Sequence, residues 1–348
     1  MAAPAETTKV VPLTCHGHSR PVTHIHFSAV VDDDQYYLIS ACKDNNPMLR
    51  DGMTGDWIGT FIGHKGAVWQ ARLSQDATLA ATGSADFTAK VWDTHTGETL
   101  HTLQHSHIVR SIAFPPQARP QILATGGAEK KLRIFDLSRS DSSPATGTST
   151  PPAANGGTVV PSNGSTTAPS FEIGPGVHQG TIRNVVWTPD SNVLVTASED
   201  QMLRWWDLRT RAPVGEYKLD GTVGSCEIDP SPLTESAQGS LSVAAGKSVY
   251  FFDAGRPATL IKQIKTDYEV ASVALHGASR KFVTGTVGDT WVRVWDFDEG
   301  KEKEMGKGHH GPIWACTFSP DGKLYATGSE DGTVKLWKFT NGPYGLWR

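Results

Sequence analysis

Several features that would place this sequence in a common functional class are missing. Its 348 residues hold only four cysteines, without CxxC spacing or disulfide density, so we expect a reducing compartment. Thirty-two Lys and Arg against 36 Asp and Glu give a net charge of −4, unlike a basic nucleic-acid binder. No apolar run reaches roughly 18 residues, and Met1 to Val11 lack the basic and apolar regions of a secretory signal. We therefore expect no membrane segment and no direct sequence-specific contact with nucleic acid.

The residue patterns of common active sites are also missing. The glycine-rich stretches lack Gly-x-x-x-x-Gly-Lys, so no phosphate loop is indicated. Cys15, His16, His18, His24 and His26 cluster near the start, but their spacing matches no standard zinc pattern. We expect no catalytic residues, no metal and no cofactor.

What the sequence does contain is a repeat. Thirty-five glycines and 21 prolines favour a turn-rich fold, and 11 tryptophans mark its period. Four tryptophans each follow an Asp by six residues, as Trp92 follows Asp86. When Arg and Phe at the equivalent position are included, the repeat has seven landmark residues. They lie about 43 residues apart, except for one longer gap: Arg50, Trp92, Phe135, Trp206, Phe252, Trp295 and Trp337.

Each unit also begins with a Gly-His pair or its remnant and contains alternating strands and tight turns. Gly17-His18, Gly63-His64 and Gly308-His309 are full pairs, and four short strands fit between successive pairs. This pattern resembles the WD-repeat family. The resemblance implies an all-β fold, a seven-bladed β-propeller in which residues 1–348 form a single closed ring. Residues 8–13 are expected to supply the outer strand of the last blade.

The resemblance also implies hydrogen-bonded lines of His, Ser or Thr, Asp and Trp that recur from blade to blade. Such repetition argues against a hydrolase triad, because an enzyme needs one site rather than several copies. Blades 3 and 5 depart from the pattern and are expected to rely more on apolar packing. The predicted lines are His64, Ser84, Asp86 and Trp92 in blade 2, His178, Ser198, Asp200 and Trp206 in blade 4, and His309, Ser329, Asp331 and Trp337 in blade 7.

Partner contacts are expected on one face, here called the narrow face, which carries the starts of the first strands and the turns between second and third strands. Trp and Arg dominate protein interfaces, although the tryptophans could instead pack between blades and the arginines could hold carboxylates. The predicted contact residues are Trp69, Trp314, Arg110, Arg183, Lys43, Glu199 and Glu330.

One segment falls outside the repeat. Residues 138–170 hold 23 Ser, Thr, Gly or Pro and no aromatic residue before Phe171, so we expect a disordered insertion between the third and fourth strands of blade 3. It could be a tolerated spacer or a recruiting segment modified on Ser and Thr.

Further motifs resemble one branch of the WD-repeat family, the serine/threonine kinase receptor-associated proteins, also called Unrip. They are Pro47-Met48-Leu49-Arg50, the stretch 55–69, the stretch 86–93 and the closing Tyr344-Gly345-Leu346-Trp347. The resemblance implies a non-enzymatic, cytoplasmic and nuclear scaffold in the survival-of-motor-neuron complex, spliceosomal ribonucleoprotein assembly and mRNA translation. Its partners would be Gemin-type or Sm-type proteins or an Unr-like cold-shock protein, bound by a monomeric propeller. The alternative is subunit i of translation initiation factor three, which shares Gly-His-x-Gly-Ala-Val-Trp.

Overall fold

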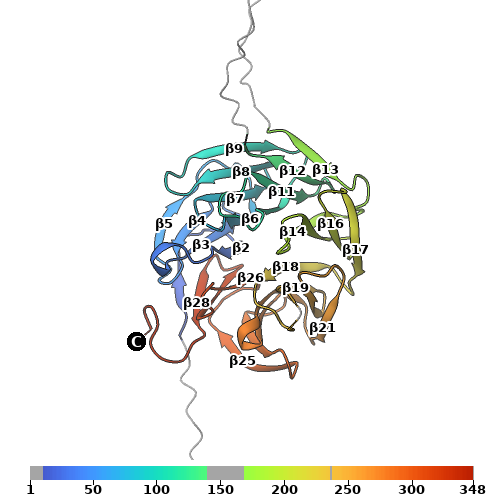
Figure 1. Ribbon diagram of the computed structural model, residues 1–348. Helices are drawn as coiled ribbons and strands as arrows, with labels where there is room; N and C mark the ends of the chain where they lie inside the picture. Colours follow the sequence, from blue (N-terminus) through green and yellow to red (C-terminus); the bar gives the residue numbers. More distant parts are fainter. Residues whose placement is uncertain (1–10, 139–167, 236, 348) are drawn as a thin grey trace, which may run out of the picture.

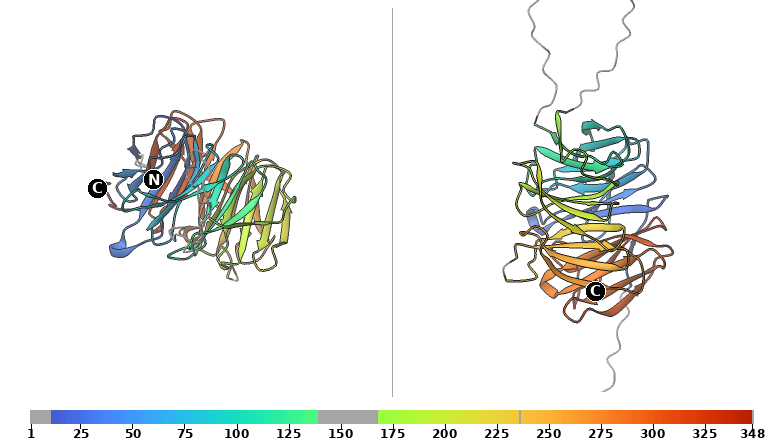
Figure 2. Two further views of the ribbon diagram at one scale, coloured as in Figure 1. Left: turned by 90° about the horizontal axis from the view of Figure 1, so that it is seen from above. Right: turned by 90° about the vertical axis from the view of Figure 1, so that its right-hand side faces the viewer.

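The chain folds into a ring of seven blades, as the repeat predicts. The computed structural model describes residues 11–138, 168–235 and 237–347. Each blade is an antiparallel sheet of four strands, and the sheets follow one another around a central channel (Figure 1). Seen edge-on, the ring is a thick disc (Figure 2). The all-β, seven-bladed propeller is therefore confirmed.

The strands of each blade run in sequence from the channel to the rim, except in blade 7, whose rim strand is β1. Two short 3-10 helices, η1 (Asp32–Asp34) and η2 (Gly277–Ser279), lie between strands. The first four blades are β2 (Val22–Phe27), β3 (Tyr37–Cys42), β4 (Met48–Asp51) and β5 (Trp57–Thr60); β6 (Val68–Leu73), β7 (Leu79–Ser84), β8 (Thr88–Asp93) and β9 (Thr99–Gln104); β10 (Val109–Ala113), β11 (Ile122–Gly127), β12 (Leu132–Asp136) and β13 (Ser170–Ile173); β14 (Ile182–Trp187), β15 (Val193–Ser198), β16 (Met202–Asp207) and β17 (Ala212–Lys218). The last three are β18 (Val223–Asp229), β19 (Ser240–Ala245), β20 (Ser248–Asp253) and β21 (Leu260–Lys265); β22 (Val270–His276), β23 (Lys281–Thr286), β24 (Trp291–Asp296) and β25 (Lys301–Lys307); β26 (Ile313–Phe318), β27 (Leu324–Ser329), β28 (Val334–Lys338) and β1 (Leu13–Cys15).

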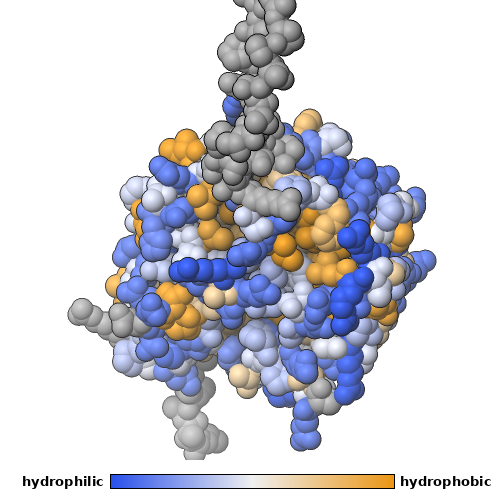
Figure 3. Space-filling view, turned by 45° about the horizontal axis from the view of Figure 1, so that its top comes forward, coloured by the Kyte–Doolittle hydropathy of each residue, from blue (hydrophilic) through white to orange (hydrophobic). Residues whose placement is uncertain are grey.

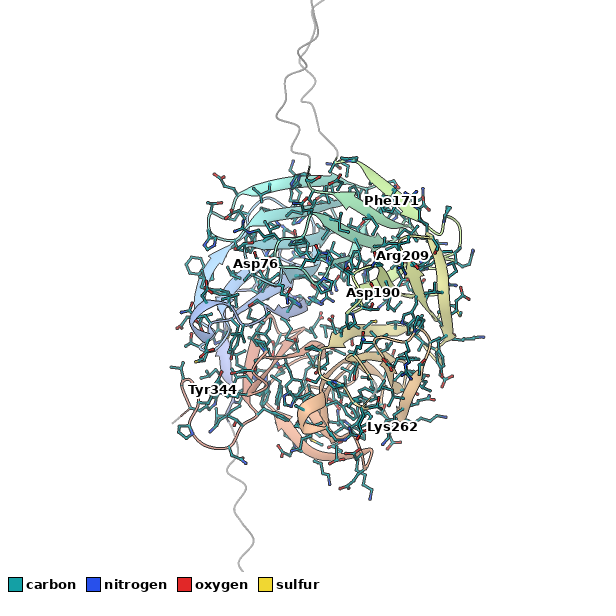
Figure 4. All side chains as sticks on the ribbon, viewed as in Figure 1. Asp76, Phe171, Asp190, Arg209, Lys262 and Tyr344 are labelled. Atoms are coloured by element: carbon teal, nitrogen blue, oxygen red, sulfur yellow. The ribbon has the colours of Figure 1, made fainter. Side chains whose placement is uncertain are left out.

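The two ends of the described chain close the ring together. Strand β1 pairs antiparallel with β28, with Leu13 opposite Leu336 and Cys15 opposite Val334. The predicted outer strand is thus present at residues 13–15, while residues 8–10 lie outside the described part. After β28 the chain turns back, and the Trp347 indole nitrogen donates to the Val11 carbonyl at 2.9 Å. Figure 4 labels Tyr344, another residue of this returning segment.

The core lies between adjacent blades rather than at the centre of the ring. Alternate residues of each strand face the neighbouring blade, so buried clusters combine residues of two blades. Trp205 of blade 4, for example, packs edge-on against Phe252 of blade 5, with ring centroids 5.5 Å apart. On the side shown in Figure 3, hydrophobic residues form separate patches among hydrophilic ones. Each blade therefore depends on its neighbours for burial.

Two further predictions concern segments rather than blades. Strand β12 ends at Asp136 and β13 begins at Ser170, so the residues between them join the third and fourth strands of blade 3. Residues 139–167 lie outside the described residues, and the predicted disorder of the insertion stays a prediction. None of the helices found in the described residues has the length and apolar character needed to cross a bilayer.

Candidate protein-interaction site

The hydrogen-bonded line of blade 2 contains a threonine where the sequence predicts a serine. The His64 ring lies 2.8 Å from Asp86 through Nδ1 and 2.7 Å from the Thr82 hydroxyl through Nε2. The Trp92 indole donates to the same hydroxyl at 2.8 Å. The prediction of Ser84 was wrong, because its hydroxyl instead donates to the Gly66 carbonyl and accepts from the Asp86 amide. Thr82 is fully buried, so its hydroxyl is closed off from solvent.

Blade 7 repeats this arrangement with Thr327 in place of the predicted Ser329. The hydroxyl of Thr327 lies 2.8 Å from both the His309 ring and the Trp337 indole nitrogen. His309 also contacts Asp331 at 2.9 Å. Burial opposes ionisation of Asp331, but its hydrogen bonds from the His310 amide, a neighbouring threonine and His309 outweigh burial and hold its pKa at about 2.

Blade 4 departs from the predicted line in two ways. Its hydroxyl is Thr196, 2.8 Å from the Trp206 indole nitrogen, rather than Ser198. The guanidinium of Arg204 lies between the other two members, 3.3 Å from His178 and 2.9 Å from Asp200. The predicted direct contact between that histidine and that aspartate is therefore replaced by an arginine bridge.

Blades 3 and 6 form polar contacts at the same place with other side chains. In blade 3, Glu129 lies 3.5 Å from His105 and 2.7 Å from Arg133, while the Thr125 hydroxyl has no hydrogen-bond partner among the described residues, so the expectation that apolar packing dominates there stays a prediction. In blade 6 the Tyr268 hydroxyl takes the histidine position, 2.8 Å from the Thr284 hydroxyl. The lines of blades 2, 4 and 7 thus belong to a wider set of polar contacts that also includes blades 3 and 6.

A bulge in the innermost strand places the predicted contact residues on the narrow face. In all seven blades the pairing of this strand with its neighbour skips one residue, the second of the strand. A bulge re-aims the side chain of the skipped residue. Around the ring, the skipped residues are Thr23, Trp69, Arg110, Arg183, Gly224, Ala271 and Trp314.

Three of the predicted contact residues stack on one another at the channel mouth. The Arg110 guanidinium lies 3.8 Å from the centre of the Trp69 ring, and the Lys43 ammonium lies 5.8 Å from it. Burial and the nearby charge of Arg183 lower the pKa of Arg110 to about 10, although Glu199 opposes this. The stack therefore concentrates positive charge beside an aromatic ring.

The other predicted residues form two pairs around the same opening. Arg183 contacts Glu199 at 2.9 Å, and the Trp314 indole nitrogen donates to Glu330 at 2.5 Å. Both glutamates are exposed, so they extend the pairs towards solvent. Arg183 thus pairs with a carboxylate, which is the alternative role that the sequence analysis gives to the arginines.

These residues surround a cavity at the narrow end of the channel. Its volume is about 320 Å³, and its lining includes Lys43, Trp69, Arg110, Arg183 and Trp314. The equivalent positions of blades 1, 5 and 6 carry small side chains, which leave that side of the opening unobstructed. Such a cavity suits a side chain or short loop of another protein, held by aromatic and cationic groups.

Sequence reasoning missed a charged cluster inside the channel. Glu227 of blade 5 lies 2.7 Å from the Arg72 guanidinium of blade 2 and 3.3 Å from the His24 ring of blade 1. Burial opposes ionisation of Glu227, but the charge of Arg72 and the hydrogen bond to His24 hold its pKa at about 2. The available signal was polar residues at alternate positions of the innermost strands, the positions that face the channel.

His26, which lies near Arg72 and Glu227 of this cluster, makes stability depend on pH. Burial, with the nearby charge of Arg72, lowers the pKa of His26 to about 3. Below about pH 6.5 the unfolded chain binds a proton that folded His26 does not, so stability falls as pH drops from about 6.5. We expect His26→Asn to make the free energy of unfolding less pH-dependent between pH 6 and pH 4, by up to about 1 kcal/mol per pH unit. Urea unfolding at stepped pH would measure this change.

The matched control for this pH prediction is His95→Asn, at an exposed position. His24 and Glu227 titrate in the same channel and stay in both variants, so they contribute equally to the background. An unchanged pH dependence in His26→Asn would contradict the prediction.

The N-terminal histidines that were considered as metal ligands have other roles. His24 and His26 line the channel, whereas His18 belongs to the blade 1 line, 3.0 Å from Asp44 and 2.8 Å from the Ser40 hydroxyl. Possible ligand atoms of His18, Cys42 and Asp44 do lie within 4.8 Å of one another. They are used in hydrogen bonds, the Cys42 thiol donating to a backbone carbonyl at 3.0 Å.

Comparison with known proteins agrees with this architecture. The family model "WD domain, G-beta repeat" matches residues 55–93, 97–136, 175–207 and 300–338. The chain is 42% identical to the serine-threonine kinase receptor-associated protein of Gallus gallus over 97% of its own length and 85% of that protein. This chain belongs to the serine-threonine kinase receptor-associated protein family. The family member of Dictyostelium discoideum is 38% identical over 94% of this chain and 98% of its own length.

A second group of WD-repeat proteins is similar at lower identity. Eukaryotic translation initiation factor 3 subunit I of Nematostella vectensis is 29% identical over 94% of this chain and 96% of its own length. The family assignment to the receptor-associated proteins rests on the higher identity over nearly the whole chain.

Proposed function

We propose that this chain is a non-enzymatic scaffold that binds protein partners through its narrow face. The observation that carries this proposal is the stack of Lys43, Trp69 and Arg110 at the mouth of the cavity. Aromatic and arginine side chains that meet in a partly enclosed site are the usual centre of a protein interface. The hydroxyl groups of the polar lines are buried, which supports a structural role for them.

Two exposed apolar residues extend the same face. Ile62 lies in the connection that enters blade 2 and is 78% exposed. Phe87 lies in the turn between the second and third strands of blade 2, is 43% exposed and has a φ of 67°. A bulky residue in the left-handed region costs roughly 1 kcal/mol, and the half-exposed Phe87 ring contacts the His107 ring. A partner contact would explain why this position carries an aromatic residue.

The partners proposed for this scaffold follow from the family. We propose that it acts in ribonucleoprotein assembly, within the survival-of-motor-neuron complex that builds spliceosomal particles, and in mRNA translation and stability. The partners would be Gemin-type or Sm-type proteins or an Unr-like cold-shock protein, in the cytoplasm and the nucleus. The similarity to initiation factor 3 subunit I favours a second candidate, a subunit role in translation initiation.

Affinity purification of variants from cells tests this proposal. We expect Trp69→Ala combined with Trp314→Ala to lower partner recovery at least about tenfold, because the double change removes both aromatic groups at the opening. Quantitative mass spectrometry of the purified complexes would measure the recovery. Val214→Ala is the matched control, because this exposed apolar residue lies on the rim strand of blade 4.

The identity of the recovered proteins separates the candidates. Recovery of Gemin, Sm or Unr-like proteins supports the ribonucleoprotein role, and recovery of initiation factor 3 subunits supports the second candidate. Equal recovery by the folded double variant and the wild type would exclude the narrow face as the binding site.

A further inference from the structure

Two of the cations at the narrow end of the channel have no carboxylate to pair with. In the part of the chain that the structure describes, the side chains of Lys43 and Arg110 form no ion pair and no hydrogen bond, and both lie over the Trp69 ring. Arg183 differs from them, because Glu199 contacts it at 2.9 Å. The positive charges of Lys43 and Arg110 are therefore available to an anion from outside the chain.

The Arg110 guanidinium is held by stacking rather than by hydrogen bonds. Its central carbon lies 3.8 Å from the centre of the Trp69 ring. A guanidinium stacked on an aromatic face keeps its N–H groups free at the edge of its plane, where they match the two oxygens of a carboxylate. These nitrogen atoms are not sealed inside the protein, since the buried and unpartnered arginine nitrogens among the described residues belong to Arg50 and Arg72. Arg110 thus offers oriented donors at the cavity.

A buried amide in the same cavity also lacks a hydrogen-bond partner. Asn184 follows Arg183 in β14, lines the cavity and is only 6% exposed. Its side-chain oxygen is buried and accepts no hydrogen bond from any residue that the structure describes. Since buried polar groups are normally hydrogen-bonded, this oxygen indicates that an occupant of the cavity brings a donor. A peptide brings such donors in its backbone N–H groups.

The acidic residues around the opening limit which anion can enter. Glu199, Glu269 and Glu330 are all exposed there. The first pairs with an arginine and the last is bonded to an indole, whereas Glu269 forms no ion pair within the described ranges. Like charges repel, so these three carboxylates oppose the approach of a nucleic acid or of a run of acidic residues. A single carboxylate that reaches past them to the cations meets much less repulsion.

We propose that this cavity binds one glutamate or aspartate side chain of a partner's polypeptide segment. The carboxylate accepts hydrogen bonds from the Arg110 guanidinium, and the Lys43 ammonium adds a second positive charge. The segment enters over Gly224 and Ala271, whose small side chains lie across the channel from Trp69. A volume of about 320 Å³ suits a few side chains rather than a folded domain. The inference rests on the proposed scaffold function, since the segment belongs to a protein partner.

Peptide titration of the purified full-length chain, followed by NMR of the tryptophan indole N–H groups, tests the proposal. The probe is the capped tripeptide acetyl-Ala-Glu-Ala-amide, and acetyl-Ala-Gln-Ala-amide has nearly the same shape without the charge. We expect the glutamate peptide to shift the Trp69 signal with a dissociation constant of roughly 1 mM, and the glutamine peptide to bind at least about tenfold more weakly. Trp69→Phe identifies the signal by removing it.

Three variants show which group recognises the carboxylate. Arg110→Gln should abolish the preference, so that both peptides bind equally weakly. Arg110→Lys keeps the charge but loses the planar set of donors, and it should bind the glutamate peptide at least about threefold more weakly than the wild type. The matched control is Arg119→Gln, which removes a charge from a side chain that is 86% exposed between β10 and β11, at the opposite end of the channel. It should keep the full preference, and circular dichroism should show the same thermal unfolding for all variants.

Equal binding of the two peptides to the wild type overturns the proposal, and so does an unchanged preference in Arg110→Gln. A short oligouridylate that shifts the Trp69 signal at a lower concentration than the glutamate peptide also overturns it and assigns the cations to phosphate groups. These results are independent of the purification from cells. If the carboxylate preference fails while the tryptophan double variant loses its partners, the narrow face remains the binding site and only its chemistry is wrong. If the preference holds while partner recovery is unchanged, the proposed function fails instead.

Discussion

Thr82→Val is expected to destabilise the propeller by about 2–4 kcal/mol, because the variant leaves the buried indole N–H of Trp92 and the buried Nε2 atom of His64 without a hydrogen-bond partner. In the wild type the Thr82 hydroxyl is bonded to the His64 ring and the Trp92 indole, at 2.7 and 2.8 Å. Valine keeps the shape of threonine but offers no hydrogen-bonding group, so the loss is polar rather than steric. Urea unfolding followed by tryptophan fluorescence would measure the change.

Blade 3 provides the matched control for this prediction. Thr125 holds the equivalent position, but the landmark residue there is Phe135, and the Thr125 hydroxyl has no hydrogen-bond partner among the described residues. Thr125→Val should therefore change the free energy of unfolding by less than about 0.5 kcal/mol or increase it, since it removes an unsatisfied polar group. Equal destabilisation by the two variants would show that the loss at Thr82 comes from packing.

Glu227→Gln is expected to destabilise the ring by about 2–3 kcal/mol at pH 7, because it leaves the Arg72 guanidinium in the channel without a countercharge. The figure is below that of a fully buried pair, since the Glu227 side chain is 23% exposed. This residue joins blade 5 to blades 1 and 2 across the channel. The free energy of unfolding in urea, measured for both proteins, checks the expected loss.

A double variant distinguishes the lost pair from general damage to blade 5. Arg72→Met combined with Glu227→Leu removes both charges, and apolar replacement of a buried pair is often neutral. We expect the double variant to recover at least half of the loss seen in Glu227→Gln. The loss in Glu227→Gln should also shrink as pH falls from about 4.5 towards 2, because wild-type Glu227 gains its advantage only where the unfolded carboxyl is ionised. A single variant as stable as the wild type would contradict the role of the ion pair.

The period of the repeat could be predicted from the sequence, whereas the hydroxyl that reaches the buried indole in each blade could not. Trp92 and its equivalents are large, buried and regularly spaced, so they mark the third strand of each blade. Residues two apart in a strand face the same way, and both Thr82 and Ser84 therefore fit the predicted hydroxyl position. Only the three-dimensional structure shows that the threonine lies within reach of the indole.

The candidate site was predictable for the same reason, and its chemistry was not. The narrow-face positions follow from the repeat, since Trp69, Arg110, Arg183 and Trp314 are each the second residue of an innermost strand, and the other three directly follow a second strand. The stacking of Arg110 on Trp69 depends on side chains from two adjacent blades, and the bond between Arg72 and Glu227 joins residues 155 positions apart. Neither relation is contained in a local pattern, because each requires the closed ring.

The pairing of β1 with β28 sets the order in which this protein can be completed during synthesis. Strand β1 leaves the ribosome first, but its partner is translated about 320 residues later, roughly 15–65 s at ordinary elongation rates. Blades 1 to 6 can form while the chain is still growing, and the first residues must stay unpaired until the last blade emerges. A bulky fusion before Leu13 would therefore delay the final step of folding, whereas the same fusion placed after β13 would leave it unaffected.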